Sequence, residues 1–163
     1  MSITKDAGPP KQIKFSYTYT ELFEVVSLTT NVIAETILDD KNVAMLDEYG
    51  ITEDEKYTVT QKMYNAADKV FGRLMKITNG VTDSVVLSDS SIECSILDKE
   101  AYNQNVLEAI DRYIKDALIN YIIKDWFLDK NKLDYAKIYE TKYYENIKDI
   151  TKRSVQLRKS VIT

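Results

Sequence analysis

Helical periodicity dominates the last third of the chain. Residues 98–128 include the stretch 117–128, in which nine of twelve residues are apolar, and a helix this apolar is covered on nearly every side. Residues 131–159 carry a narrower apolar stripe at helical spacing. Its members are Leu133, Ala136, Tyr139, Tyr143, Ile147, Ile150 and Leu157. The pattern predicts two long helices joined by a short break at residues 129–130, with Trp126 buried at their junction.

The first half of the chain predicts two further helices. Thr20 is the expected N-cap of the first, which extends to about residue 38. Its expected inward positions are Leu22, Val25, Val26, Thr29, Val32, Ile33 and Ile37. The second begins at residues 52–55, Thr-Glu-Asp-Glu, which form a capping-box signature, and extends to about residue 77. Gly72 lies inside this helix and indicates close approach of another helix.

Three segments favour extended structure. Residues 13–19 alternate between apolar and polar side chains, which predicts a short strand. Two apolar runs around a Ser-Asp-Ser-Ser turn predict a β-hairpin at about residues 83–97, and Asp98 is expected to cap the following helix. Since a lone hairpin is marginal in water, this one must pack on the helices or pair with something. Residues 1–12, with Pro9-Pro10, predict an extended arm, and residues 160–163 a tail.

The predicted fold class is therefore mainly α. One four-helix bundle-like domain is expected over residues 13–159, with one short β-hairpin and the extended N-terminal arm. The chain has 163 residues, enough to bury a core, and only four Gly and two Pro. Such a shortage of helix breakers favours long helices over a barrel or sandwich with many turns. We expect about 60% helix by this pattern.

Composition mainly excludes functions. The chain has no histidine and one cysteine, Cys94, which removes the usual general base, the His-dependent nucleophile systems and cysteine metal clusters. Four glycines are too few and too scattered for a P-loop or a dinucleotide fingerprint. No apolar run is long enough for a membrane span. The chain is therefore predicted not to be an enzyme, with no catalytic, cofactor-binding or metal-ligating residues, no small-molecule ligand and no membrane partner.

Charge is distributed unevenly along the chain. Residues 21–57 carry ten acidic residues and two lysines, a balance of −8, whereas residues 130–163 carry nine basic and four acidic residues, a balance of +5. One interpretation is a solvated helix end, where cations suit the C-terminal dipole. The other is that the opposite patches let identical subunits meet head to tail, a contact that closes into a ring when the rotation permits.

Tyrosines and bases interleave near the C-terminus. Such a pattern can clamp single-stranded nucleic acid. However, Tyr139 and Tyr143 fall on the apolar stripe and acidic residues intervene, which favours packing at a core edge or subunit interface. The candidate interface residues are Tyr135, Tyr143, Tyr144, Lys152, Arg153, Arg158 and Lys159.

Two segments carry a family resemblance. Residues 118–127 form a buried helix that ends in the aromatic pair Trp126-Phe127, and residues 135–147, after a short break, form a helix of the Tyr-x-x-x-Tyr kind. Together with the order of arm, helices and hairpin, this arrangement resembles the head–tail connector (adaptor) proteins of tailed bacteriophages, in particular those of crAss-like phages of Bacteroides-type hosts. The resemblance covers about residues 98–159.

The resemblance implies a virion protein that assembles in the host cytoplasm. It implies a homo-oligomeric ring, commonly of twelve copies, that contacts portal and tail proteins and passes genomic DNA without sequence specificity. No catalytic residue is implied. A second hypothesis is a cytosolic helical nucleic-acid-binding or regulatory module that uses the basic segment 142–159.

Overall fold

The computed structural model describes residues 11–78, 84–98 and 104–159. Within these ranges, it leaves some side chains undescribed, namely those of residues 11, 12, 75–78, 84, 85, 96–98, 104 and 155–159. The helices are α1 (Tyr19–Thr36), α2 (Leu46–Tyr49), α3 (Lys56–Thr78), α4 (Gln104–Asp129) and α5 (Leu133–Lys159), with a 3₁₀ turn, η1 (Glu53–Glu55), before α3. The strands are β1 (Lys11–Thr18), β2 (Ser84–Leu87) and β3 (Ser91–Asp98).

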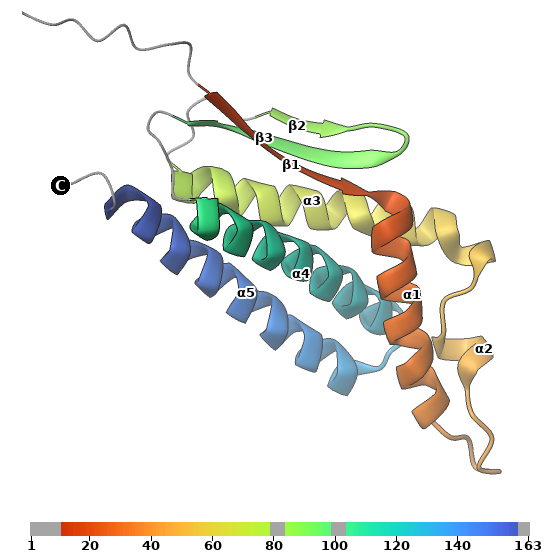
Figure 1. The fold of residues 1–163 in the computed structure, drawn as a ribbon. Coiled ribbons are helices and arrows are strands. Elements are labelled where there is room, and N and C mark those ends of the chain that lie inside the picture. Colours follow the sequence, from red (N-terminus) through yellow and green to blue (C-terminus); the bar gives the residue numbers. More distant parts are fainter. Residues whose placement is uncertain (1–10, 79–83, 99–103, 160–163) are drawn as a thin grey trace, which may run out of the picture.

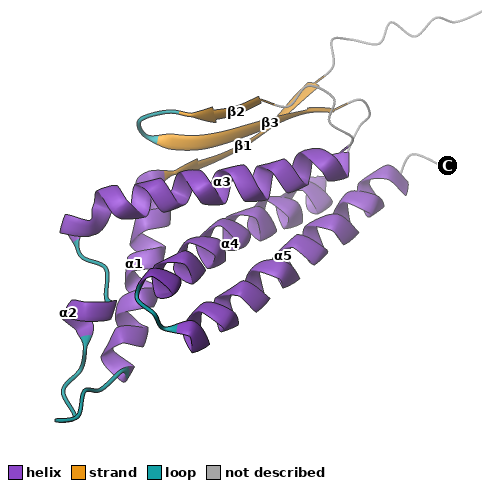
Figure 2. Ribbon diagram, turned by 180° about the vertical axis from the view of Figure 1, so that it is seen from behind, coloured by secondary structure: helices purple, strands orange, loops and turns teal. Residues whose placement is uncertain are grey.

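The helices α3, α4 and α5 run alongside one another, and a small sheet covers the side of α3 and α4 that faces away from α5 (Figures 1 and 2). The helix α1 leaves the sheet and crosses these helices at one end, where α2 packs beside it. The core lies between the layers. The predicted mainly-α fold with a hairpin is confirmed.

The sheet contains one strand more than the hairpin. Its order is β1-β3-β2, and β1 pairs antiparallel with β3 from Lys11 opposite Asp98 to Thr18 opposite Ser91. Two expectations are corrected here. The arm cannot extend to residue 12, because Lys11 and Gln12 already belong to β1; residues 1–10, like the tail 160–163, lie outside the described residues. Asp98 ends a strand and does not cap α4.

Alternation along the strands gives the sheet its buried face. This face consists of Phe15, Tyr17, Ile92 and Cys94. The opposite face is polar, with Lys14 Nζ 2.8 Å from a carboxylate oxygen of Glu93. The hairpin is therefore stabilised by a third strand and by the helices beneath it, as its marginal stability in isolation requires.

The helix α1 begins two residues earlier than predicted. Thr18, not Thr20, is the N-cap, and its side chain accepts a hydrogen bond from the backbone N of Glu21 at 3.2 Å. The predicted inward positions Val25 and Val32 are wrong, since these side chains are 37% and 54% exposed. The face of α1 that the rest of the chain covers runs instead through Leu22, Phe23, Val26, Thr30 and Ala34, so Val25 and Val32 lie outside it.

The helix α3 follows its prediction closely. The capping box is present, with the backbone N of Thr52 donating to Glu55 Oε2 at 2.8 Å. The predicted inward residues with described side chains are all buried. They are Val59, Met63, Ala66, Ala67, Val70, Phe71 and Leu74.

The helices α4 and α5 form the most extensive pair in the molecule. Asn120 Nδ2 donates to Asn146 Oδ1 at 2.8 Å across this pair and so fixes its register. The break is a left-handed turn at Asn131 (φ 59°), closed by the backbone N of Lys132 donating to the carbonyl oxygen of Phe127 at 2.8 Å. Leu133, predicted to be on the buried stripe, is exposed because it lies in the first turn beside this break.

Candidate functional site

A groove runs between α3 and α5 on the surface of the bundle. It consists of two adjoining depressions, of about 500 Å³ and 830 Å³, that share Arg73, Tyr144 and Ile147. We call this the α3–α5 groove. The other residues that line it are Asp68, Lys69 and Gly72 of α3 and Tyr143, Glu145, Lys148, Asp149, Thr151 and Lys152 of α5.

Gly72 opens the α3 side of the groove. A Cβ built on Gly72 would meet no atom within 4 Å apart from its local helix neighbourhood. The prediction that Gly72 marks close approach of another helix is therefore wrong. Because the residues beside it in α3 that face the core are buried, the missing side chain leaves space at the surface without leaving a void in the core.

Two adjacent tyrosines supply the floor and the rim on α5. Tyr143 is 9% exposed, and its ring centroid lies 5.2 Å from that of Tyr121 in an edge-to-face arrangement. Burial raises the pKa of Tyr143 above its ordinary value. Tyr144 is 61% exposed and its centroid lies 5.2 Å from that of Tyr143. This step from buried to exposed aromatic surface suits contact with a partner.

The rim of the groove carries both signs of charge. Its bases are Lys69, Arg73, Lys148 and Lys152, and its acids are Asp68, Glu145 and Asp149. None of the four bases forms an ion pair with another residue in the described part of the chain. The groove therefore combines an apolar floor with a mixed rim that is net basic.

The predicted interface residues do not lie together. Tyr143, Tyr144 and Lys152 line the groove. Tyr135 belongs to the internal packing of the α4–α5 pair, since its ring centroid lies 5.3 Å from that of Phe127. Arg153 is half-buried.

The last two predicted interface residues, Arg158 and Lys159, have side chains outside the described residues. Sequence reasoning also missed the α3 half of the groove, Lys69, Gly72 and Arg73. These residues alternate with core positions and look like any solvated helix face; the glycine was the available signal.

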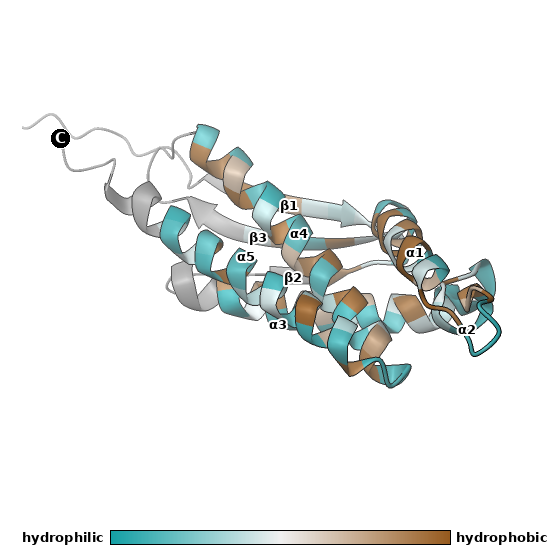
Figure 3. Ribbon diagram, turned by 90° about the horizontal axis from the view of Figure 1, so that it is seen from below, coloured by the Kyte–Doolittle hydropathy of each residue, from teal (hydrophilic) through white to brown (hydrophobic). Residues whose placement is uncertain are grey.

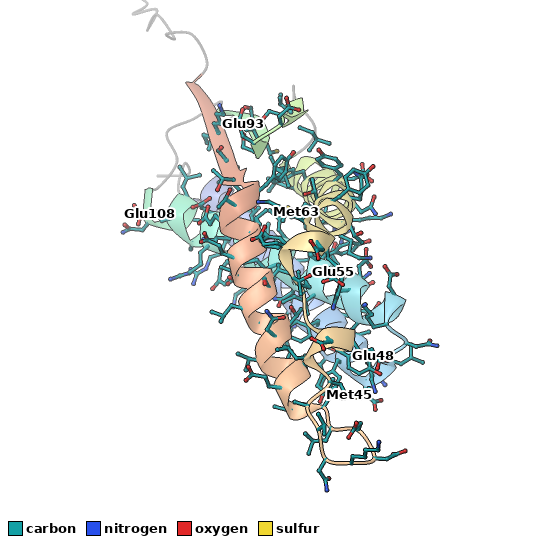
Figure 4. All side chains as sticks on the ribbon, turned by 90° about the vertical axis from the view of Figure 1, so that its right-hand side faces the viewer. Met45, Glu48, Glu55, Met63, Glu93 and Glu108 are labelled. Atoms are coloured by element: carbon teal, nitrogen blue, oxygen red, sulfur yellow. The ribbon has the colours of Figure 1, made fainter. Side chains whose placement is uncertain are left out.

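Residues 21–57, which we call the acidic segment, occupy the end of the molecule opposite the C-terminal end of α5 (Figure 1). Figure 4 looks onto this end, with Glu48 and Glu55 near α2 and the start of α3. Side-chain hydrogen bonds hold it in place: Asn31 Oδ1 accepts from the backbone N of Ile51 at 2.7 Å, and Asp39 Oδ1 accepts from the backbone N atoms of Lys41 and Val43 at 2.8 and 2.9 Å. The acidic end is thus a well-formed surface.

The described residues contain no group of three or more His, Cys, Asp or Glu side chains arranged to hold a metal ion. No helix in the described ranges has the length and apolarity needed to cross a membrane. Cys94 is buried under the sheet.

Comparison of the chain with protein-family models, with curated proteins and with solved structures gave no match.

Proposed function

We propose that this chain is a structural subunit of a head–tail connector ring of the kind found in tailed bacteriophages. In this role it joins a portal to tail proteins, lines the path of the exiting genome and performs no catalysis. Its proposed location is the virion, after assembly in the host cytoplasm. The sequence resemblance over residues 98–159 supplies the family in this proposal.

The observation that supports it best is the separation of charge along the bundle. The acidic segment that includes α1, α2 and η1 lies at one end, and the C-terminal end of α5, which has no acidic residue after Asp149, lies at the other. Two different, complementary surfaces on one subunit favour a heterologous contact, and heterologous contacts close into rings when the rotation permits.

Particle mass and shape test the proposal. Mass photometry of the purified chain across a concentration series is expected to show multiples of the subunit, with closed rings in negative-stain electron microscopy. An antibody against the chain is expected to label the junction of head and tail in tailed particles that contain it. A monomer at every concentration, or label at another part of the particle, would contradict the proposal.

The nucleic-acid-binding hypothesis rests on the lysines of α5. Lys148 and Lys152 are exposed beside Tyr144, but Glu145 and Asp149 lie in the same groove and oppose the approach of phosphates. Fluorescence anisotropy with a single-stranded oligonucleotide separates the two roles. The connector proposal expects no binding beyond weak, salt-sensitive contact. Tight binding by a chain that remains monomeric would favour the alternative.

A further inference from the structure

The outer face of α1 is an apolar surface that no other described residue covers. Val25, Leu28 and Val32 lie at helical spacing on one face, and Leu28 is 68% exposed. We call these three residues the α1 stripe. A single exposed leucine is ordinary. However, six of the thirteen exposed large apolar side chains in the described part of the chain fall between residues 25 and 46. Figure 3 shows this apolar colouring on α1.

Acidic residues border the α1 stripe. Glu21 pairs with Lys115 of α4, whereas Glu24 and Glu35 form no ion pair with another described residue. The stripe is therefore apolar at its centre and negative at its edge. A surface that covers it well must offer an apolar floor and uncompensated cations at its rim.

The α3–α5 groove has this composition. Its floor is formed by Gly72, Tyr143 and Ile147, and its rim carries the four bases named above. Three acidic residues in the same groove reduce the net charge of the seven charged groups to +1. The unpaired bases are thus available to the acids beside the α1 stripe, while Tyr144 adds exposed aromatic surface next to them.

The two surfaces cannot meet within one subunit. The helix α1 crosses the end of the bundle where α4 ends and α5 begins, whereas the groove lies toward the other ends of α3 and α5 (Figure 1). A contact between them must join two molecules. Because the two surfaces differ, a dimer formed by this contact still has one free α1 stripe and one free α3–α5 groove. Further subunits can bind to these free surfaces, and the repeated contact builds a ring or a filament.

We infer that the α1 stripe of one subunit docks in the α3–α5 groove of a second copy of this chain. The inference rests on the proposed function and deepens it, since it names the two surfaces through which the subunits of the ring would meet.

Cysteine cross-linking tests the pairing directly. Leu28→Cys places a thiol on the α1 stripe, and Gly72→Cys places one in the groove, where a side chain has space. With a short bismaleimide, the double variant is expected to give a ladder of multimers. An equimolar mixture of the two single variants is expected to stop at dimers, and each single variant alone to give none.

Two controls accompany the cross-linking. The unmodified chain should give no product, because its Cys94 is buried. Replacing Gly72→Cys by Ile138→Cys, on an exposed part of α5 outside the groove, should abolish the ladder. Cross-linking of Leu28→Cys alone would show a symmetric contact between α1 helices and overturn the inference.

Charge reversal gives an independent readout. Glu24→Lys with Glu35→Lys, or Arg73→Glu with Lys148→Glu, is expected to weaken self-association about tenfold, as like charges then face each other. An equimolar mixture of these two variants is expected to recover assemblies of alternating subunits, because the reversed stripe of one variant matches the reversed groove of the other and the two unchanged surfaces match each other. Lys142→Glu, on α5 outside the groove, is the matched control.

The outcomes separate the inference from the proposed function. An oligomeric chain that shows neither the paired cross-link nor the effect of charge reversal overturns the inference alone, because the ring then uses other surfaces. A chain that stays monomeric at every concentration overturns both.

Discussion

The indole Nε1 of Trp126 donates a hydrogen bond to the backbone carbonyl oxygen of Tyr49 at 2.7 Å. This bond joins the last turns of α4 to α2, far apart in the sequence. Two cation–π contacts lie beside it: Lys130 Nζ is 4.7 Å from the Trp126 ring and Lys132 Nζ is 4.5 Å from the Tyr49 ring. The hydrogen bond and the two cation–π contacts thereby join α2 to the end of α4 and to the turn before α5. Because Trp126 is the only tryptophan in the chain, its fluorescence reports on this junction.

Trp126→Phe should destabilise the chain by about 1–3 kcal/mol, because the buried carbonyl of Tyr49 loses its donor. Trp126→Ala should cost about 3–5 kcal/mol, as truncation of a large core side chain does. Urea unfolding followed by circular dichroism measures both. In the unmodified chain, tryptophan emission should be blue-shifted, since Trp126 is 2% exposed; emission like that of tryptophan in water would contradict this placement.

The two described glycines should respond oppositely to alanine. Gly72→Ala should stabilise the chain by about 0.5–1 kcal/mol, because its Cβ meets nothing and alanine is the better helix former. Gly50→Ala should destabilise it, because a Cβ there would lie 2.6 Å from the carbonyl oxygen of Leu46 and from Asn31 Oδ1. Melting temperatures of the two variants give the comparison. Loss of stability in Gly72→Ala would show that the groove is more crowded than described.

Stability should fall as the pH rises above about 10, the ordinary tyrosine value. Burial, and then the hydrogen bond that Tyr17 Oη donates to Asp111 at 2.6 Å, raise the pKa of Tyr17 far above that value. The folded chain therefore keeps a proton that the unfolded chain releases, so this contribution is complete below pH 10 and is lost above it. Tyr17→Phe should flatten the decline in urea unfolding between pH 9 and 11. Tyr57→Phe serves as the control, because the Tyr57 side chain is exposed. This substitution should leave the decline in stability between pH 9 and 11 unchanged.

Tyr143 and Tyr144 should separate folding from assembly. Tyr143→Ala removes a ring packed on Tyr121 and should cost about 3–5 kcal/mol, as aromatic truncations in a core do. Tyr144→Ala should change the free energy of unfolding by less than about 1 kcal/mol, because that side chain is exposed. Urea unfolding measures the change in stability of both variants. Mass photometry measures self-association, which Tyr144→Ala should reduce. An equal loss of stability in both variants would argue against a division into floor and rim.

Several elements could be predicted from short stretches of the sequence, because their causes are local. Helical spacing placed the long helices, the Thr52–Glu55 capping box marked the start of α3, and the nine apolar residues within 117–128 predicted a buried helix. Each of these depends on residues within one or two turns, so the information lies in a single stretch of chain. The hairpin and the break before α5 were predictable for the same reason.

Other features depend on residues that are far apart in the sequence and became evident only in the folded chain. β1 became a third strand because β3 offered it an edge whose paired residues lie 73 to 87 positions further along the chain. Val25 and Val32 stayed exposed because the other elements cover the face of α1 that carries Phe23, Thr30 and Ala34. The sequence named Tyr143, Tyr144 and Lys152, but only the packing of α3 beside α5 brought Arg73 to them and left Gly72 open. Periodicity shows which side of a helix is apolar; what covers that side is settled by the other elements of the fold.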